Sequence, residues 1–212
     1  MTRHDRRTRL LAFALAGVAG FVDAVGFIAS GGFFVSFMSG NTTRAGVGLA
    51  EGSLATAGAA GLIGLFVVGV MAGTALGRRT EAAGRRVTAV LCLVTVLLMA
   101  AGGFWIAGMT PGALAMLALA MGAENAAFER EGEVSIGVTY MTGALVKMGQ
   151  HMTTALTGGP RWGWVPYGLL WAALATGAAA GAAAFLQVGP AALGVAVAAA
   201  AGLTALAAVW RR

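Results

Sequence analysis

Long apolar stretches without charged residues alternate with short charged blocks along the chain. Most of these stretches reach the ~20 residues that an α-helix needs to cross a ~30 Å hydrocarbon core. The fourth stretch is short unless it is extended through Asn125 to Phe128, which would place Glu124 inside the membrane or at its edge. The pattern predicts six transmembrane helices, near residues 10–29, 54–77, 87–109, 111–123, 164–186 and 188–210.

Two further apolar segments, residues 31–50 and 134–153, do not fit as additional spans. The first contains the polar run Ser39 to Thr43, and a seventh crossing would disturb the distribution of basic residues described below. We therefore expect each segment to be a broken or re-entrant helix. Such backbone survives at membrane depth only where it is buried in protein or lines a cavity, so these segments are the candidate functional regions.

The two broken segments belong to an internal repeat. The sequence from Gly20 to Gly46 reappears from Gly122 to Gly149, and Gly69-Val-Met-Ala-Gly73 corresponds to Gly177-Ala-Ala-Ala-Gly181. Two halves that each cross the membrane three times must be inverted relative to one another, as in many transporters of small solutes. We expect an all-α membrane protein with one membrane domain, built from two inverted three-helix repeats, residues 1–109 and 110–212.

Charge and composition refine this picture. Charged residues make up only 10% of the chain and apolar residues 58%, which a soluble domain could not accommodate. The excess of Ala, Gly and Arg, with a single Lys, is typical of a GC-rich bacterium. The connections on one predicted side carry Arg residues, and the alternate connections 51–53, 108–111 and 187–190 have no Lys or Arg, so we expect an inner-membrane protein with both termini in the cytoplasm. This bias accounts for the net charge of +6, and we expect no nucleic-acid partner.

Equivalent polar residues occupy the two broken segments. Ser39 and Thr142 are good helix N-cap residues, and the glycines after them would let backbone approach a ligand. Helices that begin there would bring two N-termini, and the equivalent cations Arg44 and Lys147, toward one midplane site for a polar or anionic solute. The alternative is that the glycines permit close helix packing and the two cations reach to the membrane interface. The expected solute-binding residues are Ser39, Gly40, Asn41, Thr42, Arg44, Thr142, Gly143 and Lys147.

Acidic and amide residues inside the predicted spans form a second candidate group. Asp23 lies within the first span, its repeat equivalent is Asn125, and Glu124 is adjacent. A carboxylate at this depth costs at least ~2.5–3.5 kcal/mol, so it is usually paired, protonated or faces a cavity. Asp23 is therefore expected to be a coupling group for protons or cations, a structural partner for Arg44 or for N–H groups of the broken segment, or both. The run Glu129 to Glu133 is expected to be a solvated cytoplasmic turn.

The Gly69/Gly73 and Gly177/Gly181 pairs predict close helix packing between the two halves, with homodimerisation as a second interpretation. We expect no metal and no cofactor. A membrane enzyme fits poorly, because the nucleophile motif Gly-x-Ser-x-Gly is absent and Ser39 has only His151 to recruit, since His4 lies in the N-terminal tail.

The chain resembles the YoaK-type bacterial integral membrane proteins, a family of unknown function. The resemblance rests on Gly20-x-x-Asp23-Ala24 and on Met38-Ser39-Gly40-Asn41, where members typically have Met-Thr-Gly-Asn. In the second copy Thr142 is retained but Ala144 replaces the Asn. The resemblance implies six transmembrane helices and no particular substrate. The repeat itself predicts a secondary transporter of a small solute, possible substrates being anions or carboxylates, with a channel or a non-transporting structural or regulatory protein as alternatives.

Overall fold

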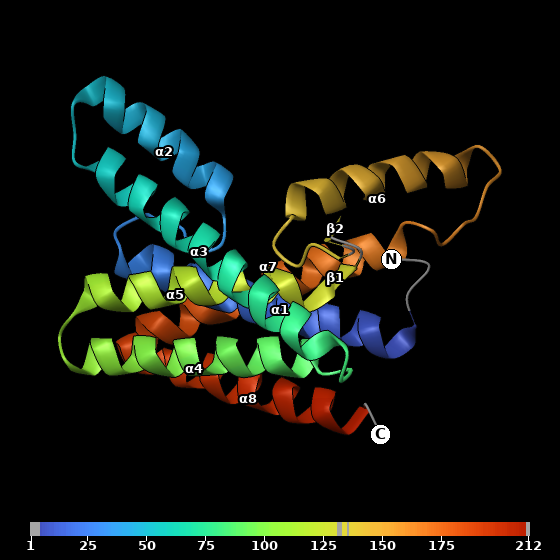
Figure 1. The fold of residues 1–212 in the computed structure, drawn as a ribbon. Helices are drawn as coiled ribbons and strands as arrows, with labels where there is room; N and C mark the ends of the chain where they lie inside the picture. The colour runs from blue at the N-terminus through green and yellow to red at the C-terminus, as the bar shows by residue number, and fades with distance from the viewer. Residues whose placement is uncertain (1–4, 131–132, 135, 211–212) are drawn as a thin grey trace.

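The computed structural model describes residues 5–130, 133–134 and 136–210, and these residues are predominantly α-helical (Figure 1). The only strands among them are two-residue segments that pair antiparallel, β1 (Glu129–Arg130) and β2 (Glu133–Val134). Two short 3-10 helices are η1 (Asn125–Phe128) and η2 (Gly189–Ala192). The α-helices are α1 (Arg6–Ala29), α2 (Met38–Glu51), α3 (Ala55–Glu81), α4 (Arg86–Ile106), α5 (Thr110–Glu124), α6 (Met141–Leu156), α7 (Val165–Val188) and α8 (Leu193–Trp210).

Four helical stretches of the described chain are long and apolar enough to cross a membrane: Arg6–Ala29, Ala55–Glu81, Arg86–Ile106 and Val165–Trp210. The last runs through α7, η2 and α8, which are two helices joined by a turn. The prediction of an all-helical protein with apolar, membrane-length helices is confirmed. The structure places the fourth predicted span in α5, which has only 15 residues and continues into η1.

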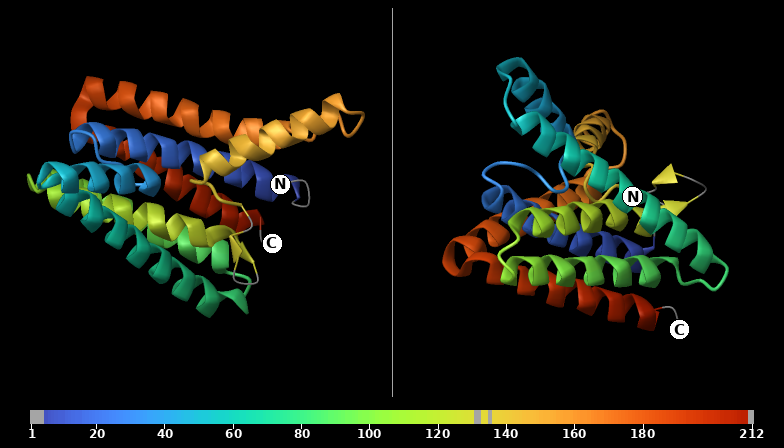
Figure 2. Two further views of the ribbon diagram at one scale, coloured as in Figure 1. Left: turned by 90° about the horizontal axis from the view of Figure 1, so that it is seen from above. Right: turned by 60° about the vertical axis from the view of Figure 1, so that its left-hand side comes forward.

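The long helices lie side by side with alternating direction (Figures 1 and 2). In Figure 1, α1, α4 and α7 run from the right-hand end of the bundle to the left, while α3, α5 and α8 run back. The shorter helices α2 and α6 lead away from the bundle in opposite directions, α2 toward the left-hand end and α6 toward the right. The residues expected to form broken segments therefore form a loop followed by a half-length helix in each half.

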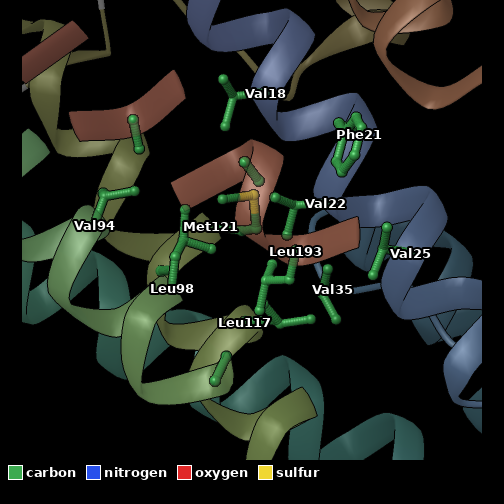
Figure 3. Close-up of a cluster of buried hydrophobic side chains, with 14 of the residues drawn as sticks. Val18, Phe21, Val22, Val25, Val35, Val94, Leu98, Leu117, Met121 and Leu193 are labelled. Atoms are coloured by element: carbon green, nitrogen blue, oxygen red, sulfur yellow. The ribbon is translucent and has the colours of Figure 1, made fainter. Parts of the chain in front are cut away.

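Helix α1 is the centre of the bundle. Within its most apolar window 61% of the residues are buried, against 22–28% for the other candidate spans. Its residues Val18, Val22 and Val25 pack against α4, α5 and α8 in one cluster, together with Val35 from the loop before α2 (Figure 3). The remaining labelled members of the cluster are Phe21, Val94, Leu98, Leu117, Met121 and Leu193.

Glycine allows α1 and α7 to touch backbone to backbone. A Cβ atom added at Gly20 would meet the carbonyl oxygen of Leu174, and one added at Gly177 would meet the carbonyl oxygen of Gly17. Gly181 lies in the same way against the carbonyl oxygen of Phe21. Only glycine leaves room for this approach, which resembles the small-residue crossings of membrane helices.

The same contact recurs between α3 and α5 at the positions that the repeat makes equivalent. Gly122 lies against the carbonyl oxygen of Phe66, and Gly69 against that of Leu119. Gly73 lies against Ala123. The Gly69/Gly73 pair belongs to the first half and packs on the second, whereas Gly177 and Gly181 do the reverse. The prediction that these glycines pack the two halves together is confirmed.

Candidate functional site

The N-terminal ends of α2 and α6 approach one another beside the bundle (Figure 1), and a cleft of about 290 Å³ lies between them. Both copies of the repeated motif contribute to its walls, and α3 adds Phe66. No charged side chain is among the residues that line it. The lining consists of residues 36–39, residues 139–143 and Phe66.

Asp23 fixes the backbone that leads into α2. Its Oδ1 atom accepts hydrogen bonds from the N–H groups of Val35 at 2.8 Å and Ser36 at 2.7 Å. Charge-assisted bonds of this kind are among the stronger protein hydrogen bonds. Asp23 is therefore a structural partner for N–H groups of the broken segment, one of the two roles expected for it, and no ion pair joins it to Arg44 among the described residues.

Asn41 closes the same loop from the other side. Its side-chain oxygen accepts a hydrogen bond from the Phe34 N–H at 3.0 Å, and its side-chain nitrogen donates to the Phe34 carbonyl oxygen at 2.7 Å. Asn41 is fully buried, so its amide takes the place of water in satisfying Phe34. Asn41 does not line the cleft. Its observed contacts are with the loop backbone and with Met38.

The second half is held by a different set of bonds. Asn125, the equivalent of Asp23, accepts a hydrogen bond from the Thr139 hydroxyl at 3.0 Å and donates to the Met121 carbonyl oxygen at 2.9 Å. Ala144 stands at the equivalent of Asn41 and is buried. The second loop therefore lacks the reciprocal amide pair of the first.

Glu124 is fully buried, and neither of its carboxyl oxygens has a hydrogen-bond partner within the described chain. An unpaired carboxylate in an apolar environment is costly, so this side chain favours its protonated form there. Among the described residues it is the acid left without a partner inside the bundle. Its equivalent in the first half is Val22, which is also fully buried.

The prediction that Ser39 and Thr142 are N-caps is wrong. Helix α2 begins at Met38 with Phe37 at the cap position, and α6 begins at Met141 with Tyr140 there. Neither cap residue makes a side-chain capping bond. Both helices begin two residues earlier than the hydroxyl residues suggest, because the N–H groups of Asn41 and Ala144 already bond the carbonyl oxygens of Phe37 and Tyr140. Ser39 and Thr142 instead lie in the first turns and line the cleft.

The two cations lie away from the cleft lining. The Arg44 guanidinium lies 4.5 Å from the centre of the Phe33 ring and next to Gly32, where a side chain would collide with it. The exposed Lys147 ammonium lies 5.9 Å from the centre of the Tyr167 ring. Each cation thus makes a cation–π contact within its own half.

Some of the remaining expected site residues line the cleft and others do not. Gly143 lines the cleft, whereas Gly40 packs against the Phe37 and Phe34 rings. The Thr42 hydroxyl donates to the Met38 carbonyl oxygen at 2.9 Å inside α2. His151 stacks on Tyr167 with ring centres 5.2 Å apart, ten residues and about 15 Å along α6 from its first residue. His4 lies outside the described residues.

The prediction of a wholly solvated turn from Glu129 is wrong at Glu129 itself. This side chain is buried and forms ion pairs with Arg78 at 3.2 Å and Arg86 at 3.1 Å. Burial alone would raise its pKa, but the hydrogen bond from Arg78 and the charges of both arginines outweigh burial and lower the pKa. Residues 131 and 132 of the turn lie outside the described residues.

Several cleft residues could not be identified from the repeat alone. Ser36, Phe37, Thr139 and Tyr140 precede the two helices and line the cleft, but only their nearness in sequence to the two motifs pointed to them. Phe66 comes from a separate helix. Within the described chain, His, Cys, Asp and Glu side chains do not gather in a group of three that could hold a metal ion.

Comparison with known proteins identifies the family of this chain. The family model described as a protein of unknown function (DUF1275) matches residues 11–206. The chain is 37% identical over 202 residues to the UPF0700 transmembrane protein RA0705 of Rhizobium meliloti (strain 1021), covering 93% of this chain and 84% of that protein. No solved structure matches the chain. The protein belongs to the DUF1275 family, whose described relative is a transmembrane protein.

Proposed function

We propose that this protein is a secondary transporter that carries a small polar or anionic solute across the bacterial inner membrane. The observation that carries the proposal is the cleft between the N-terminal ends of α2 and α6, because both copies of the repeat line it. Transporters with inverted repeats bind their solutes at such a place, where half-length helices end near the bilayer midplane.

The proposal includes six crossings. Helix α5 rises about 22 Å over its 15 residues and η1 adds about 8 Å, which together match a hydrocarbon core of about 30 Å. With α5 counted and α7 and α8 separated, each half crosses three times. The opposite courses of α1 and α5 support an inverted pair (Figure 1).

The orientation follows from the basic residues. The helix ends on the right of Figure 1 carry most of the described arginines, and Arg44 in α2 is the exception among the described residues of the opposite connections. The positive-inside rule therefore assigns the right-hand end to the cytoplasm. Arg3, Arg211 and Arg212, which contributed to the sequence prediction, lie outside the described residues. The arginines at this end are Arg6, Arg7, Arg9, Arg78, Arg79, Arg85, Arg86 and Arg161.

The cleft favours a small solute. Its volume lies at the lower end of ligand pockets, which run from ~300 to ~1,000 Å³. The hydroxyls of Ser39 and Thr142 make no hydrogen bond elsewhere in the described chain, and two helix N-termini offer free N–H groups and partial positive charge. These features suit a solute with hydrogen-bond acceptors or one negative charge. Arg44 and Lys147 have no direct part in this version of the site, because neither lines the cleft.

Glu124 is the coupling residue in this proposal. A carboxyl group that is buried without a partner can exchange a proton when the surrounding helices move, whereas Asp23 is held by two N–H groups. A proton bound at Glu124 would then accompany or oppose solute movement.

Filling the cleft tests the site. A Cβ atom at Gly143 or at Gly149 would meet no atom within 4 Å, and only Gly143 lines the cleft. In proteoliposomes screened with small anions and carboxylates, we expect Gly143→Leu to reduce solute uptake at least tenfold and Gly149→Leu, on the same helix, to leave it near wild type. Equal uptake by the two variants would contradict the site. Non-saturating flux without counterflow exchange would identify a channel instead, and no flux of any solute would favour a structural or regulatory protein.

The coupling role has a separate readout. Glu124→Gln should abolish uptake driven by a pH gradient while counterflow exchange of the solute continues. Retention of pH-driven uptake would remove Glu124 from the mechanism and leave the cleft unaffected.

A further inference from the structure

A second cavity lies far from the cleft, where the first turns of α1 meet the start of α7. This α1–α7 groove, of about 530 Å³, is lined on one side by Arg6, Arg9, Leu10 and Phe13. These four residues follow the spacing of one helix face, so basic residues occupy its end and apolar residues its deeper part. Arg6 and Phe13 are about 10 Å apart along the helix axis.

The opposite wall of the groove is apolar and comes from α7 and the loop before it. Leu169 is 50% exposed and Trp162 is 74% exposed. Exposed apolar groups of this kind in a membrane protein lie against lipid, and Trp is typical of the interface between headgroups and acyl chains. The groove therefore changes from cationic to apolar over the distance that separates a lipid phosphate from its first acyl carbons.

The described residues include no acid that pairs with the basic end of the groove. Arg6 and Arg9 form no ion pair with any acid among the described residues. The Arg9 Nε atom is shielded from solvent and has no hydrogen-bond partner in the described chain. Asp5, the adjacent acid, caps α1 by accepting a hydrogen bond from the Thr8 N–H at 3.1 Å. Two cations thus line a space that is open to an anion.

We propose that the α1–α7 groove binds one anionic phospholipid. The phosphate lies at Arg6 and Arg9, and an acyl chain covers Leu10, Phe13 and Leu169. Basic pockets at the ends of membrane helices recognise anionic headgroups by this combination of charge and apolar surface. The site rests on the membrane location of the chain and not on the proposed transport activity.

Native mass spectrometry of the purified full-length protein tests the site. The protein is mixed in detergent with equal amounts of phosphatidylglycerol and phosphatidylcholine of the same acyl chains. We expect wild type to retain phosphatidylglycerol preferentially, and Arg6→Gln/Arg9→Gln to reduce that retention about ten- to thirtyfold. The matched control, Arg79→Gln/Arg85→Gln, removes two exposed charges from the same end of the bundle outside the groove and should match wild type.

Two further arms distinguish lipid from other occupants. Leu169→Trp narrows the apolar part of the groove without changing charge and should also reduce phosphatidylglycerol retention. Circular dichroism of every variant checks its folding. If the Arg6/Arg9 variant does not fold, Leu169→Trp, which keeps both arginines, still tests the groove. Equal retention of both lipids by wild type, or wild-type retention in the Arg6/Arg9 and Leu169 variants, would overturn the proposal. Protection against thermal unfolding by inorganic phosphate as strong as that by phosphatidylglycerol would also overturn it, in favour of a simple anion site.

Discussion

The break before α2 and the break before α6 occupy equivalent places in the two halves but are held by different means. In the first, a carboxylate and a buried amide bind loop backbone at four N–H or C=O groups. In the second, Asn125 receives one hydroxyl bond from Thr139, and Ala144 offers none at the place of Asn41. Four side-chain bonds to backbone therefore hold the first break, whereas one side-chain bond holds the described part of the second.

The difference between the two breaks shows which hydrogen-bonding groups both halves share and which are present in one half alone. Both halves keep an acceptor at the position of Asp23 and Asn125, so the fold needs an oxygen there and not a charge. The carboxyl group of the second half lies one residue earlier, at Glu124, without a donor. We infer that the first half is a fixed framework and that the second half is the part suited to change conformation and protonation.

The glycine crossings are the feature that the halves share most closely, and breaking them should have the largest effect. Gly20→Ala and Gly122→Ala each place a Cβ atom against a carbonyl oxygen of the neighbouring helix. The helices must separate, which should cost about 3 kcal/mol in the free energy of unfolding. Equilibrium unfolding of each variant in mixed micelles measures this cost.

Gly64→Ala in α3 is the control, because an added Cβ there meets nothing within 4 Å. Its better helix propensity should leave stability unchanged or raise it by up to about 1 kcal/mol. If Gly20→Ala and Gly122→Ala differ by as much as either differs from Gly64→Ala, the two crossings are not equivalent.

Removing the amide found only in the first half should have the next largest effect. Asn41→Ala leaves the Phe34 N–H and C=O groups without partners, which should destabilise the protein by about 2–3 kcal/mol. Hydrogen exchange of the Phe34 amide should accelerate along with it. Unchanged protection at Phe34 would show that water replaces the amide and that the first break is not rigid.

Exchanging the equivalent residues Asp23 and Asn125 tests whether charge matters in one half only. Asp23→Asn keeps an acceptor for Val35 and Ser36 but makes it neutral, so we expect a loss of about 1–2 kcal/mol. Asn125→Asp loses its donor to the Met121 carbonyl and introduces a buried charge beside the carboxyl group of Glu124. Thermal unfolding should show the second variant to be the less stable one. If Asp23→Asn were instead the less stable variant, the inference that the first half is the fixed framework would be wrong.

The smallest effect concerns the ion pairs of Glu129, which have no counterpart described in the first half. Its lowered pKa means that the folded state releases a proton more readily than the unfolded state, so the pairs stabilise the protein above the ordinary pKa of glutamate. That contribution is lost as the pH falls through the lowered pKa. Because the Arg78 side chain is 64% exposed, we expect less than about 1 kcal/mol.

Thermal unfolding between neutral and acidic pH measures this contribution in wild type and in Glu129→Gln. The variant should be slightly less stable at neutral pH and should lose less stability on acidification. An identical pH dependence in both proteins would show that Glu129 contributes nothing.

Features that depend on local composition were predictable from the sequence. The apolar stretches near 10–29, 54–77 and 87–109 coincide closely with α1, α3 and α4, because hydrophobic length alone defines them. The starts of α2 and α6 were predicted to within two residues from the polar motif.

Features that depend on distant contacts were not predictable. The capping role assigned to Ser39 failed because α2 already begins at Met38, and the bond of Asn41 to Phe34, which holds the preceding loop, follows no periodic pattern. The burial of Glu129 depends on Arg78 and Arg86. These arginines lie at the end of α3 and at the start of α4, far from Glu129 in the sequence. The cleft itself depends on how two halves of the chain meet, so the repeat could predict its motifs but not Phe66 or Tyr140.

The backbone contacts of α1 have a consequence for how the protein is made. Its closest partner, α7, is completed about 160 residues later, or roughly 8–30 s at ordinary rates of synthesis. During that time the exposed glycine face of α1 and the carboxylate of Asp23 must be tolerated by the membrane or by an insertion factor. Asp23 can bind its own loop as soon as residue 36 has emerged, so the first break shields the charge of α1 long before the helix acquires its partner.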